Sequence, residues 1–529
     1  MFKKLDTCTT VAEVIERNTG IPAENFIKGM DTPYIKNLRE AVNLLLEHRN
    51  EKIHIIGDYD SDGINATAIM KIGLERYGVH ASVRLPLRFT EGYGLSKKII
   101  DEIDQGVVIT VDNGIAAIDA IKAAKKKGLT VIVTDHHQAP VDEKGNCIFP
   151  EADIIVDPST ETESEYHDYC GAAIAYRFVK ELLPQEDLTD LMVLASIATV
   201  TDVMSLTGAN HTLVRNGLYA INHGAGVPGL RMLLEKLDKK EHIDEGDYGF
   251  LIGPIFNAAG RLYDNGASKM LELLLMDENN VQLPWKADQL IKINNRRKDI
   301  LKKSLDVADA LLTDERPIVL YHPEFGEGII GLIAGRYCEA YQCPVVVFTK
   351  TKNGILKGSG RSVPGVNLKK VLDQIQSKML GYGGHAGAAG LSIEENQLES
   401  FKGAFREACG ELPKPEACSY YDLEIKNEKQ LRTFIAEQKI FAPYGEGNPK
   451  IRVLYQNFCI DEYRKIGDGS HMMLKGEPFT AMGFGMSEAY EKIGFPKRIN
   501  GIGYLGESWF RGQRSYKFEL NQFRKGDLK

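Results

Sequence analysis

Apolar strand-like runs alternate with helical stretches between residues 52 and 137, and each apolar run leads into an aspartate. The strand-like runs cover 52–60, 106–114 and 129–137, and the helical stretches cover 64–78 and 115–128. This alternation is typical of a parallel β-sheet that helices bury on both faces. Ligands bind such sheets at the carboxyl ends of the strands. We therefore predict an α/β domain in which acidic side chains from separate strands meet in one crevice.

The most acidic segment, GDYDSDG, follows the first of these runs. Asp58, Asp60 and Asp62 alternate there, and three ionised carboxylates so close together repel one another unless a cation neutralises them. The calcium loop of EF-hands begins with the same pattern. In that loop the twelfth position is glutamate, whereas the twelfth position counted from Asp58 is Ile69, and the flanking segments are a strand and a helix. We therefore predict a divalent-metal site of another kind.

Three further segments carry side chains of the same type. Asp112 lies in VITVDNG, Asp135, His136 and His137 lie in VIVTDHH, and Asp202 ends the apolar helical segment ASIATVTD. A single aspartate at a strand end usually caps a turn. Four such placements with a histidine pair indicate a metal centre. Histidine among carboxylates indicates Mn²⁺ as readily as Mg²⁺, because imidazole suits softer ions than an all-oxygen site does.

The rest of the chain divides by pattern and composition. The first fifty residues are predicted to be helical, residues 205–285 mainly helical, and residues 285–312 one long helix without proline or glycine that could bridge two lobes. A second α/β unit begins after ERP, a proline-rich break lies near 412–418, and short alternating segments beyond it predict a small β domain. We expect four parts, which cover residues 1–210, 211–314, 315–412 and 413–529.

Length, charge and cysteine content limit the possible functions. A chain of 529 residues is too long for one hydrophobic core. The net charge of −8 argues at first against a nucleic-acid partner, but residues 292–303, 350–380 and 491–529 are locally basic. Each basic run could be a solvated face, whereas three in one acidic chain favour phosphate binding. The cysteines form no CxxC pair and no apolar run is long enough to span a membrane, so we expect a soluble, cytoplasmic protein with reduced thiols.

The motifs GDYDSDG, VDNG, TDHH and TVTD resemble, in order and spacing, the four motifs of the DHH phosphoesterase superfamily. The glycine-rich GYGGHAGAAGLSI resembles the signature of the DHH-associated domain. LRFTEGYGLS, GPIFNAAGRL, LKGSGRSVPGVNL and PYGEGNPK resemble segments of the RecJ family of bacterial single-strand-specific exonucleases. The resemblance implies a multidomain α/β protein with a parallel-sheet DHH phosphoesterase lobe, a long bridging helix, a smaller α/β DHH-associated lobe and a C-terminal OB-like β-barrel.

The resemblance also implies a dinuclear centre that holds two divalent metal ions, Mn²⁺ or Mg²⁺. Asp112 would bridge the ions, and Asp58 would lie in or beside the ligand set. The implied ligands are Asp60, Asp62, Asp112, His136 and Asp202. His137 would act on the leaving group or orient a ligand, so the expected catalytic residues are Asp112, His136 and His137, with Asp135 supporting the histidines. The family usually has Asn-Pro where this chain has Asp157-Pro158, and here we favour an aspartate that begins a turn over an extra ligand.

Nucleic-acid contacts are expected from basic and glycine-rich loops. Ser359 and Arg361 in KGSGRS are suited to grip a terminal phosphate, and the resemblance implies that they bind the 5′ end together with Arg88 and Tyr93. His385 could contact a phosphate, or it could be a satisfied histidine in a glycine turn. Candidate contacts to the strand backbone are Asn257 and Arg261, although Arg261 could equally bridge two lobes.

The C-terminal domain combines aromatic and basic residues. Aromatic rings can stack on bases while cations follow the phosphates, which holds single strands without sequence preference. Alternate aromatics could instead pack the barrel core. The residues concerned are Trp509, Phe510, Tyr516 and Phe518, among Arg511, Arg514 and Lys517. We favour Arg511 and Arg514 as contacts over any particular ring.

The resemblance implies a single-stranded-DNA-specific 5′→3′ exonuclease that hydrolyses phosphodiester bonds by two-metal chemistry and releases nucleoside 5′-monophosphates, in DNA repair and recombination. Two alternatives stay open. A DHH phosphodiesterase for short oligonucleotides or cyclic dinucleotides would not need the basic C-terminal domain. A non-catalytic replisome scaffold with a decayed DHH fold should have lost carboxylates that this chain keeps. The expected partners are single-stranded DNA, a helicase and a single-strand-binding protein, and we expect a monomer that does not associate with membranes.

Overall fold

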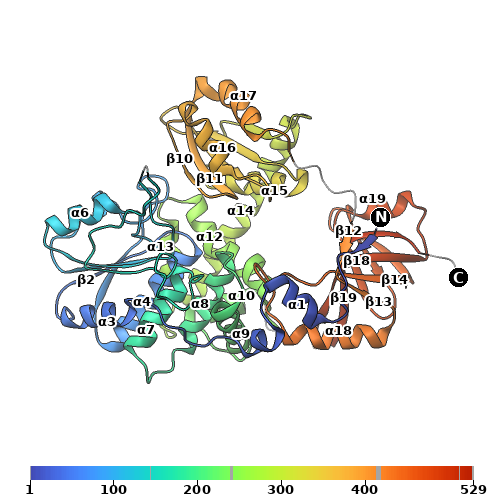
Figure 1. Ribbon diagram of the computed structural model, residues 1–529, viewed down its shortest axis with the longest axis horizontal. Helices are drawn as coiled ribbons and strands as arrows, with labels where there is room; N and C mark the ends of the chain where they lie inside the picture. Colours follow the sequence, from blue (N-terminus) through green and yellow to red (C-terminus); the bar gives the residue numbers. More distant parts are fainter. Residues whose placement is uncertain (1, 143, 239–241, 413–418, 511–512, 527–529) are drawn as a thin grey trace.

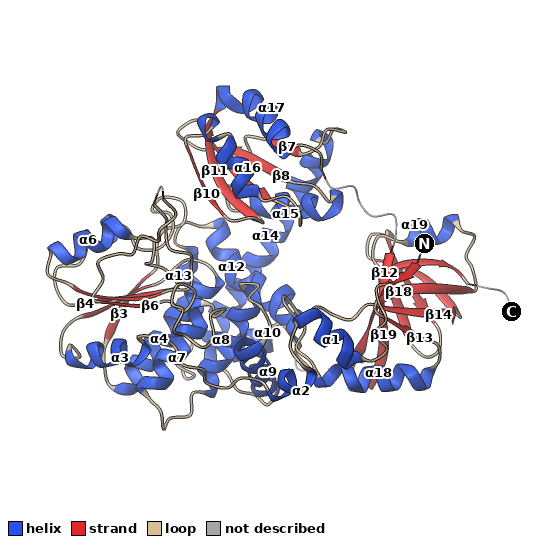
Figure 2. Ribbon diagram, in the orientation of Figure 1, coloured by secondary structure: helices blue, strands red, loops and turns tan. Residues whose placement is uncertain are grey.

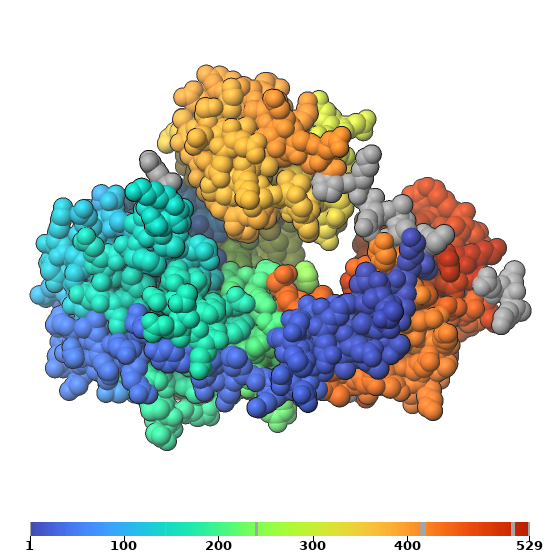
Figure 3. All heavy atoms as spheres, viewed as in Figure 1, coloured from blue at the N-terminus to red at the C-terminus, as the bar shows by residue number. Residues whose placement is uncertain are grey.

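The computed structural model describes residues 2–142, 144–238, 242–412, 419–510 and 513–526. The described chain forms a first lobe (residues 38–182), a helical region (189–311), a second lobe (318–409) and a C-terminal barrel domain (419–525). Figure 1 shows these parts arranged around a central opening. In the space-filling view, an open gap separates the second lobe from the barrel domain (Figure 3). No helix within the described ranges has the length and apolar character that crossing a bilayer requires.

The first lobe is built on a five-stranded parallel sheet with the strand order β3-β2-β4-β5-β6. Figure 2 shows this sheet in red, with helices on either side of it. Its strands are β2 (Ile53–Ile56), β3 (Ala81–Arg84), β4 (Val107–Val111), β5 (Thr130–Thr134) and β6 (Ile154–Val156). All five residues of β4 are buried, which accounts for the continuous apolar run in the sequence. The order reverses between β2 and β4, and such a switch point opens a crevice at the carboxyl ends of the strands.

Helices cover both faces of this sheet. One face packs against α3 (Leu38–Glu47), α4 (Ser61–Tyr77) and α7 (Gly171–Leu182). The other face packs against α5 (Lys97–Asp101) and α6 (Ile118–Lys126). The predicted parallel-sheet α/β lobe is therefore confirmed.

The helical region continues the hydrophobic core of the first lobe without a break. It comprises α8 (Thr189–Thr201), α9 (Gly208–Asn222), α10 (Pro228–Lys236), α11 (Glu245–Asp247), the π-helix η1 (Tyr248–Ile252), α12 (Gly253–Leu262), α13 (Gly266–Leu274) and α14 (Leu283–Leu311). The predicted long helix is α14. It begins with Pro284 in its first turn, where the missing N–H is not needed. Because Ala287 packs in the core of the first lobe and Ala308 in a core of the second, α14 joins the two lobes.

The second lobe holds a five-stranded sheet with the order β10-β11-β9-β8-β7, in which only β7 and β8 are parallel. Its elements are β7 (Ile318–Tyr321), α15 (Ile330–Tyr341), β8 (Val345–Lys350), β9 (Ile355–Arg361), α16 (Leu368–Gln374), β10 (Gly381–Gly384), β11 (Ala388–Glu394) and α17 (Leu398–Cys409), with two 3₁₀ turns at Gln376–Lys378 and Glu395–Gln397. The glycine-rich motif forms the β10–β11 hairpin, so His385 lies at its tip.

The barrel domain contains a seven-stranded sheet with the order β13-β14-β18-β19-β17-β16-β15. Its elements are β13 (Leu423–Ile425), α18 (Glu428–Ile440), β14 (Val453–Cys459), β15 (Glu462–Ile466), β16 (His471–Lys475), β17 (Thr480–Gly483), α19 (Ser487–Lys492), β18 (Arg498–Phe510) and β19 (Gln513–Lys525). The small β domain predicted beyond the proline-rich break is present.

The N-terminal segment packs with the barrel domain rather than with the first lobe, to which the sequence interpretation had joined it. Its strand β1 (Phe2–Lys4) pairs in parallel with β12 (Ser419–Tyr421), and it continues into α1 (Val11–Thr19) and α2 (Ala23–Lys28). Val14 and Ile15 are fully buried in the core of the barrel domain. Arg17 adds an ion pair to Asp422 at 2.5 Å. The amphipathic pattern of α1 predicted a helix but could not show which core its apolar face would join.

Candidate active site

The GDYDSDG segment turns the chain from β2 into α4. Asp60 is the N-cap of α4, and its Oδ1 accepts hydrogen bonds from the backbone N–H groups of Asp62 at 3.0 Å and Gly63 at 3.1 Å. Asp58 is buried, and a Cβ on Gly63 would lie 2.7 Å from the backbone of Asp58. Glycine therefore lets the helix start directly beside the buried carboxylate.

Asp62 is held from the opposite side by the first turn of α7. Its two carboxylate oxygens accept hydrogen bonds from the backbone N–H groups of Gly171 at 2.6 Å and Ala172 at 2.8 Å. The positive end of a helix stabilises a carboxylate in this position. Gly171 also lies close to Asp112, because a Cβ on Gly171 would lie 2.4 Å from the Cβ of that residue.

Asp112 leaves β4 with a φ angle of +61°, which is uncommon for a residue other than glycine. The backbone is held in this conformation by two hydrogen bonds: the Asp112 N–H donates to the Thr134 carbonyl at 3.0 Å, and the Tyr93 hydroxyl donates to the Asp112 carbonyl at 2.8 Å. Backbone strain of this kind is concentrated at functional sites. It turns the Asp112 carboxylate toward the crevice.

Asp135 orients the two histidines that follow it. Its Oδ1 accepts the backbone N–H of His136 at 2.8 Å and lies 2.8 Å from Nδ1 of His137, while its Oδ2 accepts the N–H of Ile115 at 2.9 Å. Burial opposes ionisation of Asp135, but the hydrogen bond and charge of His137 outweigh burial and lower its pKa. Burial likewise acts to lower the pKa of His137, but Asp135 raises it to about 9.

His136 is the point where four segments of the chain converge. Its Nε2 lies 3.1 Å from Oδ1 of Asp112, 3.6 Å from Oδ2 of Asp62 and 3.6 Å from Oδ2 of Asp202. Asp202 is the C-cap of α8, so it reaches the crevice from a helix rather than from a strand. Asp62, Asp112 and Asp202, which the sequence patterns predict to meet in one crevice, thus lie together around His136.

Burial and repulsion between neighbouring carboxylates raise the pKa values of Asp58, Asp60, Asp112 and Asp202. Burial is the largest cause for each of them. The charge of Asp60 adds to it for Asp58, and the charges of Asp62 and Asp60 add to it for Asp112 and Asp202. Within the described ranges, Oδ1 of Asp112 is buried and accepts no hydrogen bond. A cation would satisfy that oxygen and neutralise the cluster.

The ligand atoms form groups that fit such cations. One group contains Asp58, Asp60 and Asp112, and another contains Asp62, His136 and Asp202. Within each group the ligand atoms all lie within 4.8 Å of one another. A third overlapping group of the same tightness contains Asp112, His136 and His137. Carboxylate oxygens with one or two imidazoles are a donor set for Mn²⁺ or Mg²⁺, and Asp112 belongs to two of the groups.

A cluster of arginines from both lobes lies near these carboxylates. Arg261 donates to the Gly328 carbonyl of the second lobe at 3.3 Å, so the lobe-bridging role is present. Burial, together with the positive charges of Arg88, Arg297 and Arg361, lowers the pKa of Arg261 to about 9. Among the described residues, none of these four arginines forms an ion pair with a carboxylate. An unpaired group of guanidiniums is suited to bind an anion.

The N terminus of α15 adds to this anion site. No side chain caps it, and a Cβ on its Gly331 would lie 3.0 Å from Oγ of Ser359 and 3.3 Å from Nη2 of Arg361. Arg361 also donates to Oγ of Ser359 at 3.3 Å. The N terminus of α15, a hydroxyl and a guanidinium therefore lie together, which is a favourable arrangement for phosphate.

A cavity of about 570 Å³ connects the carboxylate cluster with the second lobe. Its lining includes Tyr93, Asn113, His136 and His137 from the first lobe and His385 from the second. The ring of Tyr93 meets that of His137 edge-on, and its hydroxyl lies 3.2 Å from Nε2 of His137. The exposed His385 thus faces the same space as the histidine pair.

Other predicted residues have different surroundings. Oδ1 of Asn257 accepts the backbone N–H of Ser61 at 3.1 Å, so Asn257 braces the start of α4. Phe518 packs in the barrel core, whereas Arg514 is exposed and contacts Glu507. Arg511 and the side chains of Trp509 and Phe510 lie outside the described residues.

Asp157 has the turn geometry expected before proline, since its Oδ1 accepts from the N–H of Ser159 at 3.0 Å and from the hydroxyl of Ser159 at 2.7 Å. Sequence reasoning did not single out Arg297, although it lies in the basic run 292–303. That run was the only available signal, because the approach of α14 to α12 is a tertiary contact.

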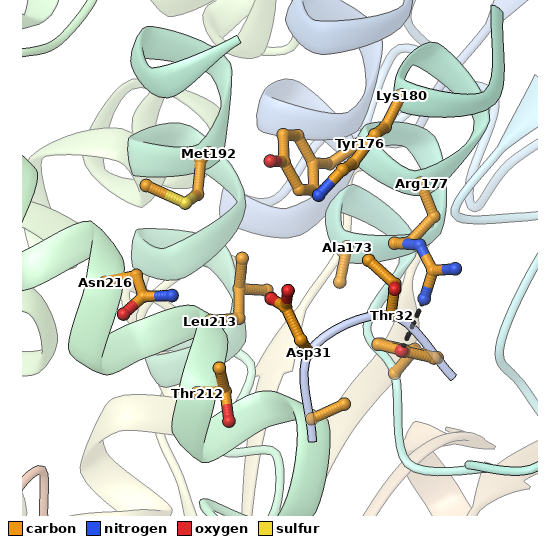
Figure 4. Close-up of a pocket in the computed structure, with 12 residues that line it drawn as sticks. Asp31, Thr32, Ala173, Tyr176, Arg177, Lys180, Met192, Thr212, Leu213 and Asn216 are labelled. Atoms are coloured by element: carbon orange, nitrogen blue, oxygen red, sulfur yellow. Dashed lines mark hydrogen bonds between the residues drawn. The ribbon is translucent and has the colours of Figure 1, made fainter. Parts of the chain in front are cut away.

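A second cavity lies on another part of the first lobe, among the loop that precedes α3 and the helices α7, α8 and α9. Its volume is about 150 Å³, and Asp31, Arg177 and Lys180 line it (Figure 4). Arg177 donates to the Tyr169 hydroxyl at 3.0 Å. None of the predicted site residues lines this cavity.

Comparison with known proteins agrees with this architecture. Residues 52–199 match the DHH family, N-terminal domain, residues 314–411 match the DHHA1 domain, and residues 421–522 match the RecJ OB domain. The single-stranded-DNA-specific exonuclease RecJ of Haemophilus influenzae is 34% identical over 94% of this chain and 90% of its own length. RecJ of Thermus thermophilus is 30% identical over 93% of this chain and 71% of its own length.

The crystal structure of Thermus thermophilus RecJ in complex with Mn²⁺ superposes with a TM-score of 0.81 at 27% sequence identity, covering 98% of this chain and 76% of that chain. A Mg²⁺ complex of the same protein superposes with a TM-score of 0.76. The first lobe, the second lobe and the barrel domain correspond to the three matched domains. Because the chain is 34% identical to a RecJ protein over 94% of its length, it belongs to the RecJ family of DHH phosphoesterases.

Proposed function

We propose that this protein is a metal-dependent exonuclease that degrades single-stranded DNA from the 5′ end and releases nucleoside 5′-monophosphates, as in DNA repair and recombination. The observation that carries the proposal is the convergence of Asp62, Asp112 and Asp202 on Nε2 of His136, beside arginines that pair with no described carboxylate. Relatives named as single-stranded-DNA-specific exonucleases support the substrate class.

Two divalent cations, Mn²⁺ or Mg²⁺, would be held by the carboxylate cluster. Asp58, Asp60 and Asp112 would hold one, and Asp62, His136 and Asp202 the other, with Asp112 between them. When bound, the ions would supply an activated water at neutral pH and stabilise charge on the phosphoryl group. The protein contributes the fixed positions of the carboxylates, which helix ends and tight turns determine.

His137 would act as a general acid toward the leaving group. Asp135 orients its ring through Nδ1, and the charge of Asp135 favours the protonated imidazole. Nε2 could then donate a proton to the departing oxygen. The Tyr93 hydroxyl, which is hydrogen-bonded to the backbone of Asp112, would keep that ring beside the cluster.

The polarity of cutting would come from end recognition. Arg88, Ser359, Arg361 and the N terminus of α15 would bind the terminal 5′-phosphate. The cavity lined by Tyr93, His137 and His385 would accommodate the terminal nucleotide, with His385 near a phosphate. Asn257 and Arg261 would act mainly as braces close to the strand. A bound end at a set distance from the cluster gives removal of one nucleotide at a time.

The barrel domain would hold the strand on its way to the site, with Arg511 and Arg514 as phosphate contacts. In this proposal residues 1–210 carry out the hydrolysis, and residues 211–314 connect the two lobes. Residues 315–412 bind the 5′ end of the DNA, and residues 413–529 bind the rest of the strand. Residues 11–26 belong to the first range but pack with the barrel domain. We also propose a cytoplasmic monomer that receives its substrate from a helicase and a single-strand-binding protein. Both alternatives are less well supported, because the carboxylate cluster is complete and the barrel domain is present.

The test uses single strands labelled at either end, with Mn²⁺. The proposal expects early release of mononucleotides from a 5′ label and late release from a 3′ label, with little degradation of a blunt duplex. Activity confined to dinucleotides would favour the short-oligonucleotide alternative. Absence of any metal-dependent hydrolysis would favour the scaffold.

A further inference from the structure

The chain leaves α8 at Asp202 through a left-handed turn. Asp202 is still held by the helix through its N–H, which donates to the Ala198 carbonyl at 2.8 Å. The next residue, Val203, has a φ angle of +58° and an exposed fraction of 66%. A left-handed conformation is unfavourable for a β-branched residue. The N–H groups of Val203 and Met204 donate to the α8 carbonyls of Val200 at 3.2 Å and Thr199 at 3.1 Å, so α8 closes the turn. Contacts further along the chain fix where the segment after the turn lies.

Those contacts come from the barrel domain. The loop 442–448, which contains most of the PYGEGNPK motif, docks on the residues that follow Asp202. The N–H of Leu206 donates to the Glu446 carbonyl at 2.7 Å, and Leu206 is buried. Figure 3 shows atoms of the C-terminal domain meeting the surface of the helical region.

Two glycines make this close approach possible. A Cβ on Gly447 would lie 2.3 Å from Oγ of Ser205, and a Cβ on Gly445 would lie 2.7 Å from Cδ1 of Leu206. Gly447 also has a φ angle of +71°, so it is favoured there for conformational reasons as well. The glycines of the motif therefore pack directly against the segment 205–206.

The loop itself is rigid enough to act as a support. Asn448 is fully buried, and its side-chain amide donates to the carbonyls of Phe441 at 3.0 Å and Pro443 at 2.9 Å. The Phe441 carbonyl also lies 3.2 Å from Nε2 of the buried His211 in α9. The loop is thus tied both to its own domain and to the helical region.

We propose that this loop of the barrel domain positions Asp202 for metal binding, with Gly447 and Gly445 as positioning residues. The barrel domain then has a second role besides holding the strand: it supports Asp202, the predicted ligand at the C-terminal end of a helix. This inference rests on the proposed metal centre. It predicts that disturbing the loop weakens metal affinity without weakening the grip on DNA.

The test compares Gly447→Ala with Gly485→Ala. Gly485 lies in the same domain with a φ angle of +68°, but nothing lies within 4 Å of a Cβ built on it. Both variants place alanine at a left-handed φ angle, and only Gly447→Ala disturbs the contact with Ser205. Mn²⁺ binding to each protein is measured without DNA, by the electron paramagnetic resonance signal of free Mn²⁺. Binding of single-stranded DNA is measured separately in EDTA by fluorescence anisotropy.

We expect Gly447→Ala to weaken the binding of one of the two Mn²⁺ ions at least fivefold, with DNA affinity within twofold of the unmodified protein. Gly485→Ala should bind Mn²⁺ normally. The double variant Ser205→Ala with Gly447→Ala should regain Mn²⁺ affinity, because the atom at 2.3 Å has been removed. High Mn²⁺ should also restore the hydrolysis rate of Gly447→Ala.

Unchanged Mn²⁺ affinity in Gly447→Ala, an equal loss in Gly485→Ala, or no recovery in the double variant would each overturn the inference. If Gly447→Ala does not fold, Gly445→Ala replaces it, since that position has no left-handed backbone, and a loss of at least twofold is expected. Unmodified protein that binds no Mn²⁺ would instead overturn the proposed metal centre, so the two failures are distinguishable.

Discussion

Nε2 of His136 lies 3.1 Å from Oδ1 of Asp112, and that oxygen is buried without accepting a hydrogen bond from any described residue. The two side chains come from the ends of the adjacent strands β4 and β5. A buried carboxylate oxygen left in this state destabilises the protein unless a cation neutralises it. The pair therefore marks the centre of the candidate site, and its removal is the most direct test.

Asp112→Ala and Asp112→Asn should lose hydrolysis of single-stranded DNA by orders of magnitude, because Asp112 belongs to two ligand groups. The fold should be retained, since the variants remove a charge from a crowded acidic cluster. Turnover with Mn²⁺ and thermal unfolding are the measurements. Asp119→Asn, on the exposed side of α6, is the control with a similar chemical change. Near-normal turnover of either Asp112 variant would refute the site.

The metal-free protein should lose stability as the pH rises. The folded pKa values of Asp58, Asp112 and Asp202 lie above the value of about 3.9 for the unfolded chain. The folded state therefore binds more protons, so this contribution to stability is fully present below about pH 4 and is lost as the pH rises through the raised folded values. Saturating Mn²⁺ should reverse the trend by binding the ionised carboxylates of the folded state.

Thermal unfolding in EDTA at pH 5 and pH 8, compared with Mn²⁺ at pH 8, checks this prediction. Asp112→Asn should unfold at a higher temperature than the unmodified protein in EDTA at pH 8 and should gain less from Mn²⁺. A metal-free protein that is equally stable at both pH values and in both forms would show that the cluster carries no excess charge.

Arg361→Ala should weaken binding of strands that carry a 5′-phosphate. Loss of a charge-assisted hydrogen bond costs about 1.5–3 kcal/mol, which corresponds to roughly a tenfold to hundredfold rise in KM. Strands with a 5′-hydroxyl should be affected much less. Steady-state kinetics on both substrates test this, with Arg406→Ala on the outer helix α17 as control. An equal effect on both substrates would argue against recognition of the terminal phosphate.

Asp135→Asn should lower Mn²⁺ affinity about 10–100-fold, the usual range for residues that orient histidine ligands. The substitution keeps the shape of the side chain but removes the charge that holds Nδ1 of His137 and the backbone N–H of His136. The Mn²⁺ concentration for half-maximal activity measures the effect. Asp142→Asn in an exposed loop of the same lobe should behave normally, and unchanged Mn²⁺ dependence of Asp135→Asn would contradict the orienting role.

Local patterns were sufficient to predict the parallel sheet, the long helix α14 and the edge of the sheet at which acidic residues gather. An apolar run such as 107–111 must be buried on both faces, and residues that follow parallel strands must share an edge. These consequences depend on residues close in sequence and on the repeating geometry of strands and helices. The fold class and the approach of Asp112 to His136 therefore followed from the sequence alone.

Only the tertiary structure decided which distant segments meet. The apolar face of α1 joins the barrel core, Asn257 supports the start of α4 instead of projecting freely, Arg297 approaches Arg261, and the loop around Gly447 packs beside the turn of Asp202. Each contact depends on shape complementarity between surfaces that are well separated in the sequence. A repeating pattern in the sequence does not predict such a contact, because the free energy that favours the contact arises only when both surfaces are already folded.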